Sequence, residues 1–283
     1  MIFILDTCAI NNLLQVDLTC SDDDCELEYD YLNKINQKFD IKLPKKNYDE
    51  LKSTFAKNFS DGKKISYIRN YINRYICRYF ETVNDDDYHS SLTFIKKICP
   101  KYKDKDNGEL HSTVYALYLN RYQKSLAFQT YFITDDDEAI QDFKAVFKSN
   151  YLGEIFTTID LLLILSIYEI ISHKNVMDFA HDLKKQYIQS YSELIYEIEL
   201  LQKTDLTSQE SSFLTKLYEN IEKLNFDNIK TDIKHSLYKN IKKKKKSIDT
   251  LLNKLLSENL NKVKILDEKI KEIKSKYWTM DKI

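Results

Sequence analysis

Glycine and proline are scarce in this chain, whose 283 residues include three glycines and two prolines. So few glycines leave no Gly-rich loop to hold phosphate groups, which argues against P-loop NTPases and dinucleotide-binding folds. The scarcity of proline excludes a Pro-rich linker, so we expect mostly helix with short connections. The apolar content of 43% is enough to build a core, and the length allows one large domain or two modest ones.

Cysteines are few, and their spacing favours neither a disulfide framework nor a zinc site. Their number is odd, and none belongs to a Cys-x-x-Cys pair. Cys20 and Cys25 flank three aspartates, but no second Cys or His pair accompanies them. We therefore expect the cysteines to be reduced, in a cytoplasmic protein. The five are Cys8, Cys20, Cys25, Cys77 and Cys99.

The hydrophobic runs are too short for a targeting or membrane segment. The N-terminal run reaches an acid at Asp6, too soon for a signal peptide. Residues 155–171 are strongly apolar, yet they include Asp160 and Glu169 and fall short of a comfortable bilayer span. We expect a buried strand and helix there, and no membrane partner.

Strand and helix patterns alternate through the first 172 residues. Short apolar runs typical of buried strands occur at 2–5, 39–44, 128–133 and 155–158. We expect helices at 10–16, 26–39, 64–82, 138–148 and 159–172, and polar, turn-like sequence at 83–105. The alternation predicts an α/β fold, a parallel sheet flanked by helices. After residue 172 the pattern is helical throughout, which predicts an all-helical C-terminal extension.

One face of the helix expected at 64–82 carries isoleucines and tyrosines beside three arginines. Such a face either belongs to the core or stacks on RNA bases. The core is the commoner outcome.

Four acidic residues lie where this pattern predicts one edge of the sheet. Asp6 and Asp136 follow buried strands, and Glu50 and Glu109 lie near the starts of helices. Ligands bind beyond the carboxyl ends of the strands in such sheets. Three of these acids also have a structural explanation: Asp6 as a helix cap, Glu50 as a partner of the helix dipole, and Glu109 in a capping box with Asp106.

Grouped carboxylates repel one another, and no Arg or Lys occurs in the same short motifs to neutralise them. Hard oxygen ligands without His or Cys select Mg²⁺ or Mn²⁺ rather than zinc. Two such ions roughly 4 Å apart activate a water and stabilise the leaving oxygen of a phosphodiester. The acids therefore predict metal-dependent phosphodiester hydrolysis.

The chain also resembles the PIN-domain nucleases, in particular their toxin-type ribonuclease branch. Five short motifs carry the resemblance, in the family's order, between residue 1 and about residue 172. They are Leu5-Asp6-Thr7 with Asn11-Asn12-Leu13-Leu14, Leu43-Pro44 with Tyr48-Asp49-Glu50-Leu51, Asp106-Asn107-Gly108-Glu109, Ile133-Thr134-Asp135-Asp136, and Thr157-Thr158-Ile159-Asp160-Leu161-Leu162. Two places depart from the family pattern: Cys8 stands where Asn or Ser is usual, and Thr157 to Asp160 replace the usual glycines of the closing element.

The resemblance implies site residues. The catalytic acids would be Asp6, Glu50, Glu109 and Asp136, and the metal ligands Asp6, Glu109, Asp135 and Asp136. Which of Asp135, Asp136 and Asp137 binds metal stays open. The side chains expected beside the metals are Thr7, Asp106, Thr134 and Asp137.

The resemblance also implies a function, a Mg²⁺- or Mn²⁺-dependent endoribonuclease acting on single-stranded RNA, with single-stranded DNA as a further substrate. A toxin or defence role, with an antitoxin or inhibitor protein as partner, is plausible for this branch. The alternative is a non-catalytic module that binds RNA or protein through its C-terminal helices. We expect a PIN-like domain at 1–174, with a helical insert at about 51–105, and a Lys-rich helical extension at 175–283.

Charge is divided unevenly along the chain. Residues 1–174 hold 22 Lys and Arg against 27 Asp and Glu, a net of −5, whereas residues 175–283 hold 21 against 17, a net of +4. Residues 230–276 alone hold 15 Lys against six acids, a net of +9. A lysine run there either grips the phosphates of the substrate or forms a solvated helix face. The run comprises Lys242, Lys243, Lys244, Lys245 and Lys246.

Two amphipathic stripes occur in the extension, at 188–201 and at 252–277, the second interrupted by Asn259. They predict two long helices that pair within the chain or form a homo-oligomer. The sequence does not choose between these arrangements.

Overall fold

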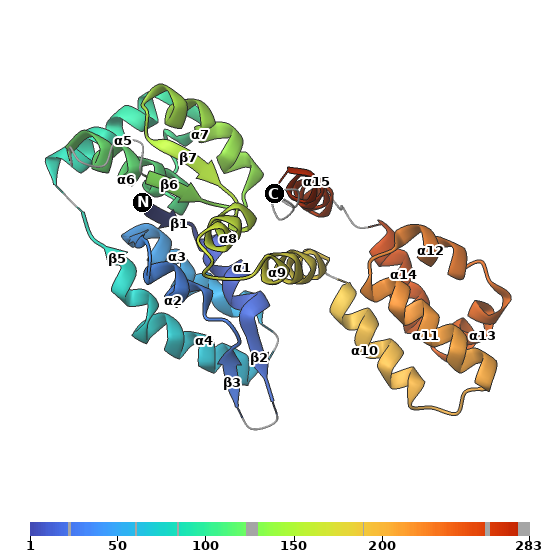
Figure 1. Cartoon of the computed structure of the whole chain (residues 1–283). Coiled ribbons are helices and arrows are strands. Elements are labelled where there is room, and N and C mark those ends of the chain that lie inside the picture. The colour runs from blue at the N-terminus through green and yellow to red at the C-terminus, as the bar shows by residue number, and fades with distance from the viewer. Residues whose placement is uncertain are drawn as a thin grey trace. The chain divides into compact units, whose positions relative to one another are not determined.

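The architecture is that of a computed structural model, which describes residues 1–21, 24–59, 61–83, 85–122, 130–188, 190–257 and 261–276. The chain divides into two compact units, Met1–Phe179 and Ala180–Ile283 (Figure 1). The first contains a five-stranded parallel sheet flanked by helices, and the described part of the second is helical. The predicted α/β class with a helical C-terminal region is confirmed.

The sheet places β1 at its centre, in the order β5-β4-β1-β6-β7 with every pairing parallel. From β1 the chain adds strands on one side and then crosses to the other, so the strand order reverses beside β1. Ligands bind at such switch points in open α/β sheets. The strands are β1 (Ile2–Leu5), β4 (Asp40–Pro44), β5 (Phe80–Glu81), β6 (Thr130–Ile133) and β7 (Gly153–Phe156).

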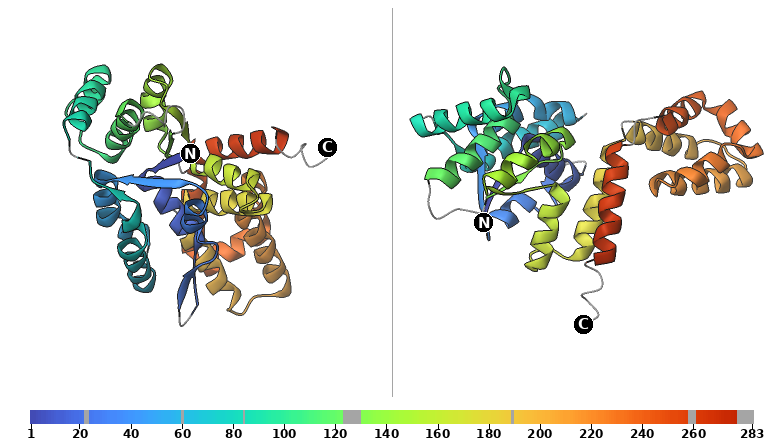
Figure 2. Two further views of the ribbon diagram at one scale, coloured as in Figure 1. Left: turned by 60° about the vertical axis from the view of Figure 1, so that its left-hand side comes forward. Right: turned by 90° about the horizontal axis from the view of Figure 1, so that it is seen from above.

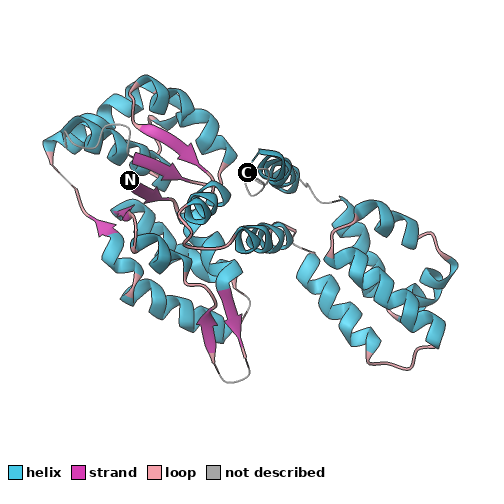
Figure 3. Ribbon diagram, viewed as in Figure 1, coloured by secondary structure: helices cyan, strands magenta, loops and turns pink. Residues whose placement is uncertain are grey.

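Helices cover both faces of this sheet (Figures 2 and 3). Ile2 and Ile4 of β1 belong to a core shared with the helices α5, α6 and α7. Phe3 alternates to the other face, where its ring contacts Phe39 at 5.1 Å between centroids. The helices of this unit are α1 (Thr7–Asp17), α2 (Tyr31–Asn36), α3 (Lys45–Thr54), α4 (Gly62–Arg74), α5 (Asp86–Ile98), α6 (Gly108–Tyr122), α7 (Asp137–Ser149) and α8 (Thr158–Ile167), with 3₁₀ turns at Phe55–Asn58, Ile76–Tyr79 and Pro100–Tyr102.

The helix expected at 26–39 is wrong over its first half. A hairpin of β2 (Leu18–Cys20) and β3 (Cys25–Leu27) comes first, and α2 begins only after Asp30, whose φ is 47°. A left-handed residue cannot continue a right-handed helix, so it separates the hairpin from α2.

The expectation that all cysteines are reduced is also wrong. The hairpin places Cys20 opposite Cys25, and the two form a disulfide with 4.1 Å between their Cα atoms. The sequence spacing of these cysteines did not indicate a disulfide. They pair because the register of the hairpin places them opposite each other. Cys8, Cys77 and Cys99 are not disulfide-bonded.

The region 64–105 holds more structure than its sequence indicated. The expected helix ends at Arg74, and the chain continues into the edge strand β5. Residues 83–105, which were predicted to be turn-like, contain α5. Asp85 caps this helix by accepting a hydrogen bond from the backbone of Tyr88 at 2.8 Å. On the predicted isoleucine and tyrosine face, Ile68 and Ile72 are buried in the core, whereas Tyr75 is 46% exposed.

The second unit has its own core, built from shorter helices than the two expected. Asn259 and Tyr277 lie outside the described residues, as do residues 128 and 129 of the third predicted strand. Among the helices described, none has the length and apolar character needed to cross a membrane. The remaining helices are α9 (His173–Gln186), which crosses the boundary between the units, α10 (Tyr191–Gln202), α11 (Ser208–Glu222), α12 (Phe226–Asp232), α13 (Ser236–Lys244), α14 (Lys246–Ser257) and α15 (Asn261–Lys276).

Candidate functional site

Asp6 lies immediately beyond β1, at the switch point, with 5% of its surface exposed. Its carboxylate accepts hydrogen bonds from the Thr7 backbone at 2.7 Å, Asn47 Nδ2 at 3.1 Å and Thr134 Oγ1 at 2.9 Å. Burial raises the pKa of Asp6, and the charge of Asp136 adds to this effect. The helix cap is therefore present, but it uses only part of the carboxylate.

The other predicted acids lie close enough to Asp6 for their charges to interact. Burial raises the pKa of Glu109, and the charges of Asp136 and Asp6 raise it further. Burial likewise raises the pKa of Glu50, with a contribution from Asp6. The fold thus brings together Asp6, Glu50, Glu109 and Asp136, which we call the acid cluster.

Glu50 reaches the cluster from α3 but serves a different helix. It lies in the sixth position of α3, and its Oε1 accepts a hydrogen bond at 2.9 Å from the backbone of Gly108, the first residue of α6. The dipole it complements is therefore that of α6. A Cβ on Gly108 would lie 2.6 Å from Glu50 Oε2 and 2.8 Å from Asn47 Nδ2, so any larger residue there would displace one of these two side chains.

Glu109 is held from two sides. Asn107 Nδ2 donates to its Oε2 at 3.2 Å. Tyr102 Oη lies 3.1 Å from the same oxygen and 3.0 Å from Asp142, and its one proton serves one of them at a time. Asn107 also caps α6, since its Oδ1 accepts from the Leu110 backbone at 3.3 Å. The predicted capping box, with Asp106 as the cap, is wrong.

Asp106, expected to lie beside the metals, is engaged by Lys46 and His111. Its carboxylate lies 2.7 Å from Lys46 Nζ and 2.6 Å from His111 Nε2. These two partners lower the pKa of Asp106 to about 2. The short motifs themselves contain no Arg or Lys, but the fold brings Lys46 to Asp106, 60 positions away in the sequence.

The three consecutive aspartates have different surroundings. Asp135 accepts hydrogen bonds from Asn12 Nδ2 at 2.6 Å and from the backbone and hydroxyl of Thr158. Asp136 caps α7 through Oδ1, at 2.8 Å from the Glu138 backbone nitrogen, and its charge acts on Asp6 and Glu109. Asp137 lies in the first turn of α7, where an acid suits the helix dipole. Of the three, Asp136 is the one whose charge raises the pKa values of both Asp6 and Glu109.

The two threonines differ as well. Thr134 is fully buried and donates directly to Asp6, as expected of a residue beside the site. Thr7 turns its hydroxyl to the backbone oxygen of Asn47 at 3.2 Å and supports the cluster through that residue.

Sequence reasoning missed the side chains that hold the acids in place. Asn47 is fully buried, and its amide bridges Asp6 and the hydroxyl of Ser112. Cys8 Sγ lies 3.1 Å from Asp6 Oδ2, and burial raises the pKa of this thiol. Asn47 precedes Glu50 by three positions and so shares its side of α3, which is the one signal the sequence contains.

The lysine run lies where α13 ends and α14 begins, and it is largely engaged within its own unit. Lys242 pairs with Asp249 at 2.7 Å, Lys244 with Glu210 at 2.9 Å and Lys245 with Glu197 at 3.0 Å. These ion pairs favour a structural role for at least part of the run.

Among the described residues, no three His, Cys, Asp or Glu side chains are already arranged as the ligands of a metal ion. The acids are instead held by the hydrogen bonds given above. Comparison of the chain with models of known protein families, with curated protein sequences and with solved structures found no match.

Proposed function

We propose that the first unit is a Mg²⁺- or Mn²⁺-dependent nuclease that hydrolyses phosphodiester bonds of single-stranded RNA, with single-stranded DNA as a secondary substrate. The observation that carries the proposal is the acid cluster at the switch point of the sheet. Desolvated carboxylates that repel one another are costly unless a cation compensates them. The PIN-like order of the motifs supports RNA as the substrate.

The donor set fits a hard divalent cation, because it consists of carboxylate oxygens. Asp6, Glu109 and Asp136 would hold the ion, and Glu50 would complete the negative site. Mg²⁺ keeps several of its waters and is often bound by one or two carboxylates, so a preformed cage of three ligands is not required. When bound, such an ion supplies an activated water and compensates charge on the phosphate.

The chain's own residues keep the acids in position. Asn47 and Thr134 fix the Asp6 carboxylate, and Asn107 and Tyr102 fix that of Glu109. Among the aspartates, the geometry favours Asp136 over Asp135 as the ligand, because Asp135 is engaged with Asn12 and Thr158.

The test is cleavage of labelled single-stranded RNA by the purified protein in Mn²⁺, with and without a chelator. We expect chelator-sensitive cleavage that Glu109→Gln abolishes. Glu154→Gln, at an exposed position of β7, is the matched control and should cleave as the unaltered protein does. Failure to cleave any single-stranded RNA or DNA would favour a non-catalytic binding module.

A further inference from the structure

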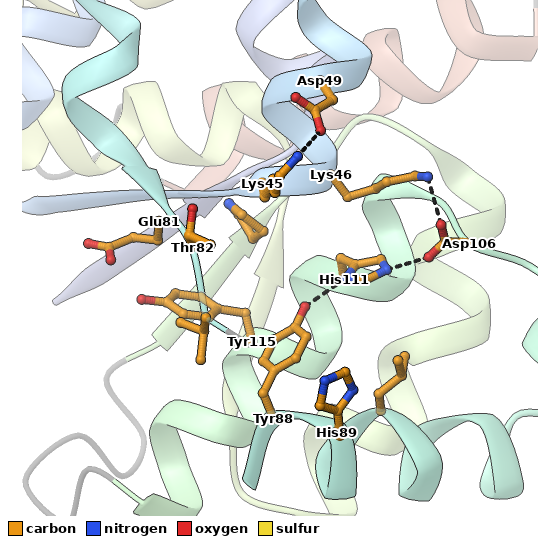
Figure 4. A pocket seen from close by; sticks show the side chains of 13 residues that line it. Lys45, Lys46, Asp49, Glu81, Thr82, Tyr88, His89, Asp106, His111 and Tyr115 are labelled. Carbon is orange, nitrogen blue, oxygen red and sulfur yellow. Dashed lines mark hydrogen bonds and ion pairs between the residues drawn. The ribbon is translucent and has the colours of Figure 1, made fainter. Parts of the chain in front are cut away.

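A pocket of about 430 Å³ lies within the first unit (Figure 4). The helices α3 and α6 contribute to both the pocket and the acid cluster. On α3, Lys45 lines the pocket while Glu50 belongs to the cluster; on α6, His111 and Tyr115 line the pocket while Glu109 belongs to the cluster. Lys46 and Asp106, which line the pocket, also act on the charge of Glu50, so the pocket adjoins the cluster on the side of Glu50.

The pocket's charges are balanced. Each carboxylate that lines it has a cationic partner: Asp49 with Lys45 at 2.8 Å, Asp106 with Lys46 at 2.7 Å, and Glu81 with Lys42 at 2.7 Å. A site with paired charges neither attracts nor repels an isolated ion strongly. It suits a neutral ligand with a polar edge.

One wall of the pocket is aromatic and held rigid. Tyr88 Oη lies 2.7 Å from His111 Nδ1, and His111 Nε2 lies 2.6 Å from Asp106, so a chain of hydrogen bonds fixes both rings (Figure 4). Tyr115 extends this wall, and the exposed side chains of Thr82 and His89 lie at the pocket's rim. The tyrosine rings are largely covered, with Tyr88 7% and Tyr115 4% exposed. Polar and apolar side chains line the pocket together, and this mixture suits the flat face and polar edge of a nucleobase.

We propose that this pocket takes one unpaired base of the single-stranded substrate, from the nucleotide next to the phosphate that is cleaved. The inference rests on the proposed function of the acid cluster. Proteins that read RNA sequence do so on bases that are splayed out of a helix, by stacking and by contacts to base edges. The pocket makes the choice of cleavage position depend on that base.

The test measures binding without cleavage. Fluorescently labelled short homopolymers of A, C, G and U are titrated with the protein in the presence of a chelator. We expect a preference of about tenfold for one base. Thr82→Trp, which fills the pocket from its rim, should reduce that preference toward equality, and Thr93→Trp, at an exposed threonine of α5 outside the pocket, should retain it.

His89→Ala provides a second pocket variant in case Thr82→Trp does not fold, and it should also weaken the preference. Equal affinity for all four homopolymers, no binding at all, or a preference that both pocket variants retain would overturn the proposal. A uniform loss of affinity would also overturn it, since it would indicate backbone contacts. Because no cleavage is measured, a base preference lost in Thr82→Trp would stand even if the nuclease proposal failed.

Discussion

Asp6 both caps α1 and belongs to the acid cluster, and its position directly after β1 makes the two roles compatible. One oxygen accepts from the backbone of Thr7, and the other accepts from Thr134. The carboxylate is buried, and burial together with Asp136 raises its pKa. Capping a helix therefore does not prevent the same side chain from belonging to a cluster of acids.

We expect Asp6→Asn to lower metal-dependent cleavage by about 10²–10³-fold or more. The free energy of unfolding should stay the same or rise without metal, because a buried charge that its neighbours repel is removed. Cleavage assays and urea unfolding in chelator check the two expectations, with the exposed Asp178→Asn as control. Unfolding of the variant, with cleavage surviving in its folded fraction, would show that Asp6 is only a cap.

Asn47→Ala should destabilise the first unit by about 1–3 kcal/mol. The change leaves the buried Asp6 carboxylate and the Ser112 hydroxyl each short of a partner. Urea unfolding measures the effect, and Asn33→Ala, on the exposed side of α2, should change stability by less than about 0.5 kcal/mol. Equal stability of the two variants would mean that Asn47 does not support Asp6.

Among the elements, the start of α6 is the most sensitive to added volume. Gly108→Ala should lower stability and weaken cleavage, although alanine is the better helix former. The new Cβ would meet Glu50 and the buried Asn47 at less than 3 Å. Gly62→Ala is the matched control, because this glycine begins α4 and a Cβ there meets nothing within 4 Å. Thermal unfolding and cleavage assays of both variants test this prediction. Unchanged stability and cleavage in Gly108→Ala would contradict the close approach of α3 and α6.

The junction between α1 and α2 should give the protein a pH dependence. Asp17 accepts hydrogen bonds from the backbones of Tyr29 and Tyr31, and burial raises its pKa from 3.8 to about 6. The pKa of Asp17 is thus higher in the folded protein than in the unfolded chain. The protonated Asp17 carboxyl therefore stabilises the fold fully below about pH 4, and this stabilisation is lost as the pH rises through about 6.

Asp17→Asn removes this titration. The free energy of unfolding of Asp17→Asn, measured relative to that of the unaltered protein, should therefore be larger near neutral pH than at mildly acidic pH. Urea unfolding at pH values on either side of the folded-state pKa measures the difference, and a constant difference would contradict the raised pKa of Asp17.

At the scale of the whole molecule, the two units carry opposite charge, and the lysine run belongs to the second. Replacing Lys242 through Lys246 by Gln should flatten the salt dependence of RNA binding, by roughly 0.7 in log–log slope for each phosphate that the lysines no longer neutralise. The ion pairs with Asp249, Glu210 and Glu197 indicate that few of the five lysines bind phosphate.

Turnover at saturating RNA should change little in the five-Gln variant, because the acid cluster lies in the first unit. Stability should fall by about 1 kcal/mol or less for the pairs with Asp249 and Glu197, and by more for the pair of Lys244 with Glu210, whose side chain is 7% exposed. Binding titrations over a range of salt concentrations measure the slope. An unchanged affinity and slope would assign the run to the packing of its own unit.

The sequence by itself determined the features that repeat within one element. Local hydrophobic patterns predict the buried strand β1 and the alternation of strands and helices, because a buried face or strand produces a characteristic spacing of apolar residues. The acids at the ends of these elements can be read from the same patterns. On this basis the fold class and the positions of Asp6, Glu50, Glu109 and Asp136 at one edge of the sheet could be expected.

Tertiary structure alone decided the pairings between distant positions. The Cys20–Cys25 disulfide depends on hairpin register, the neutralisation of Asp106 depends on Lys46, and the support of Asp6 depends on Asn47. Such pairings leave no period in the sequence, because they depend on how strands order themselves and how closely helices approach. The same reason applies to Asp135, whose hydrogen-bond partners Asn12 and Thr158 come from other elements.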